Sequence, residues 1–116
     1  LRLFLIYTAG NFIEAQDDTP YLQIGEHKYG KPILDRVIRP DTPIDDAVKA
    51  VLVSMDSTLR SNLSVGMPLD LCVLPVNTFK AQVQRIESDH KEFRQISDSW
   101  AQSLKSAFAA LPAVKI

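Results

Sequence analysis

The amino-acid sequence predicts an α+β fold in a single globular domain. In two long segments, apolar residues recur at spacings of three or four, which is the period of an amphipathic helix. In residues 79–87 they alternate with polar residues, as in a half-buried strand. Turn-forming proline, aspartate and asparagine residues separate these segments. Strands, two helices, a hairpin and a terminal helix in this order suit a sheet with helices on one face.

The first hairpin is expected near the N-terminus. Residues 1–8 are almost continuously apolar, which suits a strand covered on both faces, and residues 9–11 begin a break. Residues 16–20 form a turn, because Asp and Pro favour turn geometry and Pro20 has no N–H to donate to a strand ladder. Residues 21–24 are then expected to return beside the first strand.

Two helices follow. Pro32 fits a first helical turn, so residues 32–38 are predicted to form a short helix that ends before Pro40. Thr42 is the expected cap of a second helix over residues 43–61, with Pro43 in its first turn. The inward-facing stripe of this helix consists of Ile44, Val48, Val51, Leu52, Met55 and Leu59.

A second strand pair and a last helix complete the chain. The strands are predicted at residues 69–76 and 79–87, with a turn at residues 75–78 and Phe79, Ala81 and Val83 facing inward. The last helix follows residues 88–89 and ends before Pro112. Its apolar face consists of Phe93, Ile96, Trp100, Leu104, Phe108 and Leu111.

Composition excludes some classes of function. A net charge of −1 without a basic patch argues against nucleic-acid binding. No apolar run approaches the roughly 20 residues that span a bilayer, and the start at Leu1 does not resemble a secretory signal, so a soluble cytoplasmic parent without membrane contact is expected. The single cysteine, Cys72, is expected in the core. His27 and His90 lack the spacing of a metal site, and no cofactor is predicted.

The segment YLQIGEHKYGKPILDRVI, residues 21–38, joins a strand to a helix through a polar loop. It resembles the strand–loop–helix of proteasome-type subunits, most closely the bacterial Anbu group. Residues 1 to about 111 are similar to the second half of such a subunit. The resemblance implies that residues 1–116 are the C-terminal portion of one N-terminal-nucleophile hydrolase domain, a four-layer α/β/β/α sandwich whose first half is missing.

The resemblance also implies a chemistry. In this family an N-terminal threonine attacks a peptide carbonyl, while its own α-amino group takes the proton. The first residue here is Leu1, and the family takes the supporting aspartate and lysine from its first half, so the fragment alone is expected to be inactive. The parent is expected to hydrolyse peptide or related amide bonds as a homo-oligomeric ring.

This half can supply supporting residues. Relatives place an aspartate and a serine just after the long helix, where they hold the amino terminus. Matching Gly66 and Asp70 to that pattern places Asn62 at the aspartate position and Ser64 or Val65 at the serine position. Asn62 cannot act as a carboxylate, but its carbonyl oxygen can accept a hydrogen bond. The alternative is that this stretch is only a turn that leaves the helix.

Glu26 is the third candidate. Many relatives have glycine-serine-glycine where this chain has Gly25, Glu26 and His27. A carboxylate beside an α-amine raises the pKa of the amine and weakens it as a neutral base. The alternative is a surface or subunit contact.

The sequence is also compatible with two other functions. The parent can be a noncatalytic ring-forming scaffold or binding subunit of the same fold, or an unrelated α+β interaction domain. A threonine at the start of the mature parent chain would favour the enzyme.

Overall fold

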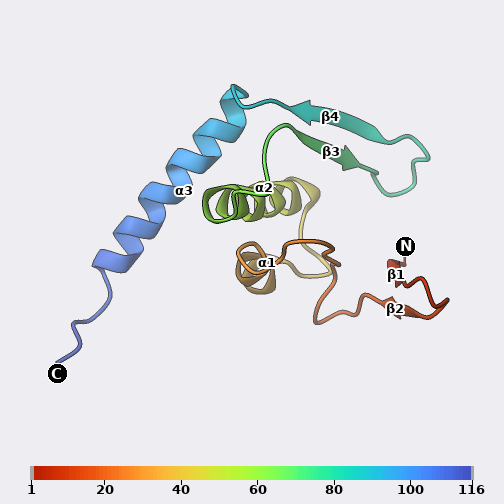
Figure 1. Ribbon diagram of the computed structural model, residues 1–116, viewed down its shortest axis with the longest axis horizontal. Coiled ribbons are helices and arrows are strands. Elements are labelled where there is room, and N and C mark those ends of the chain that lie inside the picture. Colours follow the sequence, from red (N-terminus) through yellow and green to blue (C-terminus); the bar gives the residue numbers. More distant parts are fainter. Residues whose placement is uncertain (1, 116) are drawn as a thin grey trace. The chain divides into compact units, whose positions relative to one another are not determined.

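The computed structural model describes residues 2–115, in which three helices and two antiparallel hairpins occur (Figure 1). The α+β class is therefore confirmed. The chain divides into two compact units, one up to Gly66 and one from Met67 onward. The first unit holds β1 (Phe4–Ile6), β2 (Phe12–Glu14), α1 (Lys31–Val37) and α2 (Ile44–Ser61), and the second holds β3 (Leu69–Val73), β4 (Gln82–Ile86) and α3 (Lys91–Ala109).

The N-terminal hairpin pairs β1 with β2, so the prediction that residues 21–24 return beside the first strand is wrong. Gly10 adopts a φ of 85°, a left-handed conformation that favours glycine, and the Tyr7 N–H donates to the Asn11 carbonyl at 2.9 Å. The chain therefore turns back about ten residues earlier than predicted. The turn at residues 16–19 does form, but it closes only on itself through one bridge.

Side chains at one end of this hairpin reinforce the pairing. The Arg2 guanidinium donates to both carboxylate oxygens of Glu14 at 2.6 and 2.7 Å. The Phe4 and Phe12 rings meet edge to face, with centroids 5.5 Å apart. These contacts hold the two short strands in register even though no further strand flanks them in the described chain.

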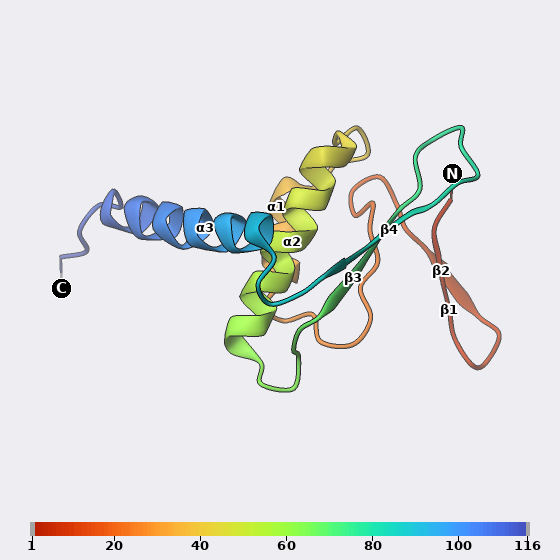
Figure 2. The same cartoon turned by 90° about the horizontal axis from the view of Figure 1, so that it is seen from above.

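Helices α1 and α2 lie side by side in both ribbon views (Figures 1 and 2). Their shared core consists of Leu34 and Ile38 from α1 and its end, and Ala50 from α2. The helices approach closely because Gly30, at the start of α1, has no side chain. A Cβ placed there would lie 2.1 Å from Ser54 Oγ and 3.1 Å from the Ser54 carbonyl oxygen.

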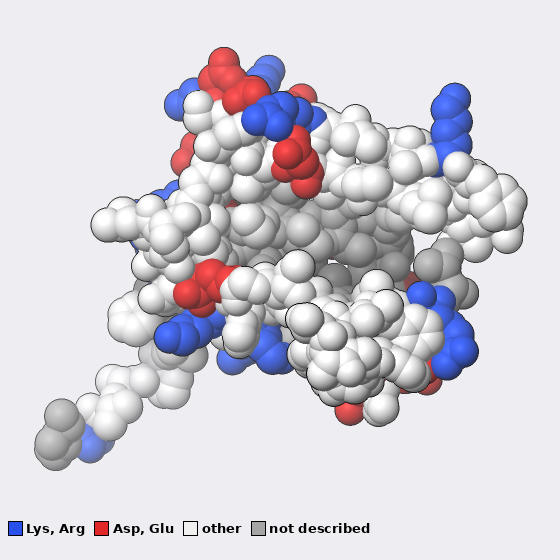
Figure 3. Space-filling model, turned by 45° about the vertical axis from the view of Figure 1, so that its right-hand side comes forward, with Lys and Arg blue, Asp and Glu red and all other residues white. Residues whose placement is uncertain are grey.

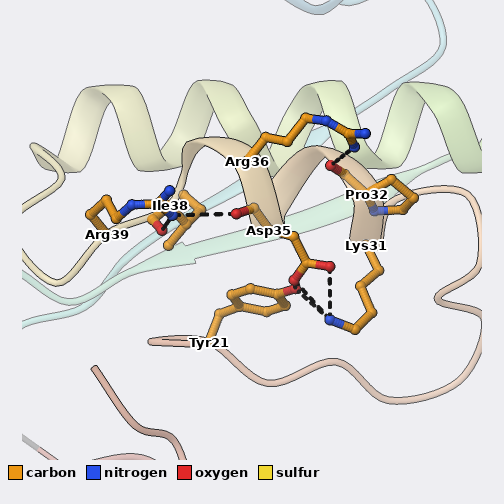
Figure 4. A network of polar contacts seen from close by, with 7 residues as sticks. All are labelled: Tyr21, Lys31, Pro32, Asp35, Arg36, Ile38 and Arg39. Carbon is orange, nitrogen blue, oxygen red and sulfur yellow. Dashed lines mark hydrogen bonds and ion pairs between the residues drawn. The ribbon is translucent and has the colours of Figure 1, made fainter. Parts of the chain in front are cut away.

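A polar network ties the segment before α1 to that helix (Figure 4). The Tyr21 hydroxyl donates to the Asp35 carboxylate, and Lys31 Nζ donates to Asp35 at 2.7 Å and to the Tyr21 oxygen at 3.1 Å. Burial raises the pKa of Tyr21, while the Lys31 bond lowers the pKa of Asp35. Tyr21 thus remains a neutral donor, and its ring packs on the helix core.

The start of α2 differs from the prediction. Pro43 occupies the N-cap position and the helix begins at Ile44 without a side-chain cap. Thr42 does not cap it, because the Thr42 hydroxyl instead accepts from the Arg39 backbone N–H at 2.7 Å. Thr42 therefore closes the link between the two helices, and Asp45 and Asp46 in the first turn complement the positive end of the helix dipole.

The second unit confirms the predicted strand pair with shorter strands. β3 and β4 are antiparallel, with Leu69 opposite Ile86 and Val73 opposite Gln82. Their link turns at Asn77, which has a φ of 62°. α3 begins after His90, whose ring nitrogen Nδ1 accepts from the Phe93 N–H at 3.3 Å.

Burial in this unit is lower than the sequence pattern predicts. Phe79 is fully exposed, Val83 is 73% exposed, and Cys72 is exposed instead of lying in the core. Along α3, Phe93 is buried but Phe108 is 78% exposed. In both ribbon views α3 leaves the end of β4 and does not lie across the hairpin, so these apolar side chains lack a cover from within the unit (Figures 1 and 2).

Charged side chains lie in small groups of mixed sign on the face shown in Figure 3. Opposite charges form ion pairs in both units, among them Asp46 with Lys49 and Asp70 with Arg85. Within residues 2–115, no helix has the length and apolar character needed to cross a membrane.

Replacing Gly30 with alanine should destabilise the protein by about 1–3 kcal/mol, because the new methyl group overlaps Ser54 and overpacked sites relax only at a cost. At roughly 2–8 °C per kcal/mol, the range for domains of about 60–250 residues, the melting temperature should fall by several degrees or more.

Gly66→Ala is the matched control, since a Cβ at Gly66 meets no atom within 4 Å. Adding Ser54→Ala to Gly30→Ala removes the closest atom and should recover part of the loss. An unchanged melting temperature in Gly30→Ala would show that the two helices do not need this close approach.

Candidate functional site

The three predicted site residues come from two segments of the first unit. Glu26 lies in the loop that leads to α1, after Gly25, whose φ of 76° turns the chain. Asn62 is the C-cap of α2, where the backbone becomes extended while the Asn62 N–H still donates to the Thr58 carbonyl at 2.9 Å. Ser64 lies in the turn that follows. Glu26 in the loop and Asn62 at the helix end are 36 residues apart in the sequence.

Direct hydrogen bonds join the three side chains. Asn62 Nδ2 donates to Glu26 Oε2 at 2.9 Å. Asn62 Oδ1 accepts from both the backbone N–H and the hydroxyl of Ser64, at 2.9 and 2.6 Å. The structure therefore brings together Glu26, Asn62 and Ser64, which the sequence placed in two separate parts of the candidate site.

Asn62 uses both acceptor positions of its amide oxygen for these contacts. An amide oxygen has two lone pairs, and Ser64 takes both. The Asn62 carbonyl oxygen, which was expected to accept a hydrogen bond from the N-terminal amine, therefore already accepts two hydrogen bonds from Ser64. A carboxylate offers about four lone-pair positions, so Glu26 and the Ser64 hydroxyl oxygen retain the acceptor capacity of this group of residues.

Glu26 is held as a carboxylate. Its Oε1 accepts from the Lys28 backbone N–H at 2.8 Å, and this bond is the main reason that the pKa of Glu26 lies below its usual value. The Lys28 charge, the Asn62 bond and the His27 charge lower that pKa further, while burial opposes them. A hydrogen bond to the ionised form favours that form, so the site carries one fixed negative charge at Glu26 near neutral pH.

The Lys28 amide is the contributor that sequence reasoning missed. A side-chain oxygen that accepts from a backbone N–H two residues later is a common turn device for aspartate and asparagine, and Glu26 and Lys28 have the same spacing. Val65, the alternative to Ser64, contributes only its backbone N–H, which donates to the Asn62 carbonyl at 3.2 Å.

The two histidines lie outside this group of residues. His27 is exposed, with Nδ1 3.1 Å from the Gly25 carbonyl, and His90 caps α3. Within residues 2–115, no three His, Cys, Asp or Glu side chains are grouped so that they could hold a metal ion.

Several solved structures match nearly the whole chain. Anbu, the ancestral β-subunit from Yersinia bercovieri, matches 99% of this chain with 58% identity and a TM-score of 0.94. Anbu from Hyphomicrobium sp. strain MC1 matches 99% with 54% identity and a TM-score of 0.94. The helical assembly of the Anbu complex from Pseudomonas aeruginosa matches 98% with 47% identity and a TM-score of 0.89.

Coverage of those proteins is smaller. The matches cover 50%, 50% and 48% of the three Anbu chains. No protein-family model and no curated protein sequence matches the chain. The resemblance first read from residues 21–38 is confirmed: the chain belongs with the Anbu proteins, the proteasome-like ancestral β-subunits, and spans about half the length of the Anbu chains that it matches.

Proposed function

We propose that this chain is the C-terminal half of a proteasome-type N-terminal-nucleophile subunit whose parent hydrolyses peptide or related amide bonds. The Asn62–Glu26 hydrogen bond is the observation that carries the proposal. It joins the two positions at which the family resemblance expects groups that orient the N-terminal amine.

The two halves of the parent have different roles in the proposed reaction. The hydroxyl of an N-terminal threonine in the other half attacks the substrate carbonyl, and the threonine amine accepts the hydroxyl proton. This half holds the amine in position: Glu26 and the Ser64 hydroxyl offer acceptors to it, and Asn62 fixes both. The proposed reaction uses no cofactor or metal. The parent is proposed to act in the cytoplasm.

Exposed apolar surfaces support a four-layer sandwich completed by the other half. Ile6 on β1 is 73% exposed and Phe12 on β2 is 63% exposed. Ile13, which points to the opposite face of the hairpin from Phe12, is 52% exposed. A strand pair that is apolar and open on both faces is an aggregation hazard unless another layer covers it.

A noncatalytic scaffold is the second candidate. The related complex from Pseudomonas aeruginosa is described as a helical assembly, so a role based on assembly alone fits the same family. A carboxylate at Glu26 also favours a protonated amine, which is a poor base. Finding a mature N-terminal threonine in the parent supports the enzyme, and its absence supports the scaffold.

The isolated chain should show no peptidase or esterase activity, because the nucleophile and its aspartate and lysine partners belong to the other half in this proposal. Purified chain is incubated with fluorogenic peptides, and the parent protein serves as the positive control. Turnover that survives repurification and disappears when a residue of this chain is mutated would overturn the proposal.

The parent should form a homo-oligomer, because α1 and α2 resemble the helices that make subunit contacts in proteasome-type rings. Val37 on α1 and Ile44 on α2 leave about half of their surfaces exposed, 50% each. Sedimentation of the full-length protein over a wide concentration range measures this. A monomer at every concentration would remove the ring model.

Asn62→Ala in the full-length protein should lower the maximal rate roughly ten- to hundredfold, because Glu26 and Ser64 both lose their fixed partner. Such a loss corresponds to on the order of 1–3 kcal/mol of transition-state stabilisation. The melting temperature should change less, since Asn62 lies at a helix end outside the core of α1 and α2.

Lys105→Ala, an exposed change on α3, is the control and should leave rate and melting temperature unchanged. If Asn62→Ala keeps the full rate, the turn after α2 is structural and its role in catalysis is refuted.

A further inference from the structure

The orientation of the Asn62 amide is fixed by a group that can only donate. The Ser64 backbone N–H has no acceptor capacity, so the atom that faces it at 2.9 Å must be the amide oxygen. The amide NH2 must then point the other way, toward Glu26 Oε2 at 2.9 Å. The positions of the amide oxygen and nitrogen of Asn62 therefore follow from their hydrogen-bond partners alone.

The second carboxylate oxygen of Glu26 must also accept a hydrogen bond. The Lys28 backbone N–H, again a pure donor, meets Glu26 Oε1 at 2.8 Å. Both oxygens of residue 26 must therefore be acceptors. A carboxylate satisfies this, whereas a glutamine at this position would place its own NH2 against either the Lys28 N–H or the Asn62 NH2.

We propose that Glu26 and Asn62 form one carboxylate–amide unit that carries a single negative charge, in which Glu26 holds the charge toward a primary ammonium group and Asn62 is its positioning residue. The role toward the ammonium group rests on the proposed function, but the single-charge requirement rests only on the hydrogen bond within the unit and the three bonds around it. The charged groups that act on Glu26 are Lys28 and His27, both on its own loop.

The unit tolerates one carboxylate but not two. With aspartate at position 62, two carboxylates would meet where the present oxygen and nitrogen are 2.9 Å apart, and one of them would take up a proton. With aspartate at 62 and glutamine at 26, every donor again meets an acceptor. The glutamine oxygen accepts from Lys28, its NH2 donates to the aspartate, and the aspartate accepts from Ser64.

The proposal therefore predicts a reciprocal rescue. In the full-length protein, Glu26→Gln and Asn62→Asp should each lower the maximal rate about tenfold or more, the size expected for one mismatched polar contact. The double variant should recover to within about threefold of the unmutated protein. Independent sites would instead give losses that multiply.

The melting temperature provides a readout that does not need turnover. In Asn62→Asp one carboxyl has a folded-state pKa raised above its unfolded value, so the deficit in melting temperature is largest at pH 7 and shrinks as the pH falls toward 5. The double variant should show no such pH-dependent deficit. As a control, Asn11→Asp with Glu92→Gln combines two exposed residues of the described chain that are not hydrogen-bonded to each other, and its effects should add.

The outcomes separate the two proposals. A double variant that is as impaired as the product of its single variants, in rate and in melting temperature, overturns the carboxylate–amide unit. If the unmutated parent has no peptidase activity but the melting temperatures show the reciprocal rescue, the proposed function fails while the unit stands.

Discussion

The close approach of Gly30 to Ser54 is the constraint on which the pair of helices α1 and α2 depends. It lets the start of α1 meet the middle of α2, so that Leu34 and Ile38 reach Ala50. It also fixes where the preceding loop runs. Ser54 and Asn62 are separated by about 12 Å along the helix at about 1.5 Å per residue. Because Glu26 lies only four residues before Gly30, its side chain can reach that helix end.

Two backbone N–H groups, rather than two side chains, determine which atoms of the candidate site must accept hydrogen bonds. Lys28 and Ser64 each present a donor that no substitution of their own side chains removes, except proline. Their partners at positions 26 and 62 must accept on those sides. The residues at 26 and 62 are therefore restricted as a pair, because an acid at both positions or an amide at both leaves one contact mismatched.

The sequence predicted helices better than strand pairing. The apolar stripe of residues 44–59 supported a predicted helix over residues 43–61, and α2 differs from it only in beginning at Ile44. A long pattern with a period of 3.6 residues indicates a helix rather than a strand. The first hairpin was misplaced because Gly10 and its left-handed turn were outweighed by the stronger turn signal at Asp17, Asp18 and Pro20. The bond between Glu26 and Asn62 was beyond prediction, since it depends on how α1 packs on α2, whereas the bonds between Asn62 and Ser64 are local to one turn. Only the choice of these residues followed from the resemblance.

Burial is distributed unevenly between the candidate site and the rest of the chain. The helix pair that positions Glu26 and Asn62 has its own core, whereas β1, β2 and much of α3 expose apolar side chains. The hydrogen bonds among Glu26, Asn62 and Ser64 therefore rest on a helix pair that packs within the described chain. In the proposed function, the acceptors that this group offers to an N-terminal amine are already held in place, which lowers the entropy cost of ordering Glu26 and Asn62 when the amine binds.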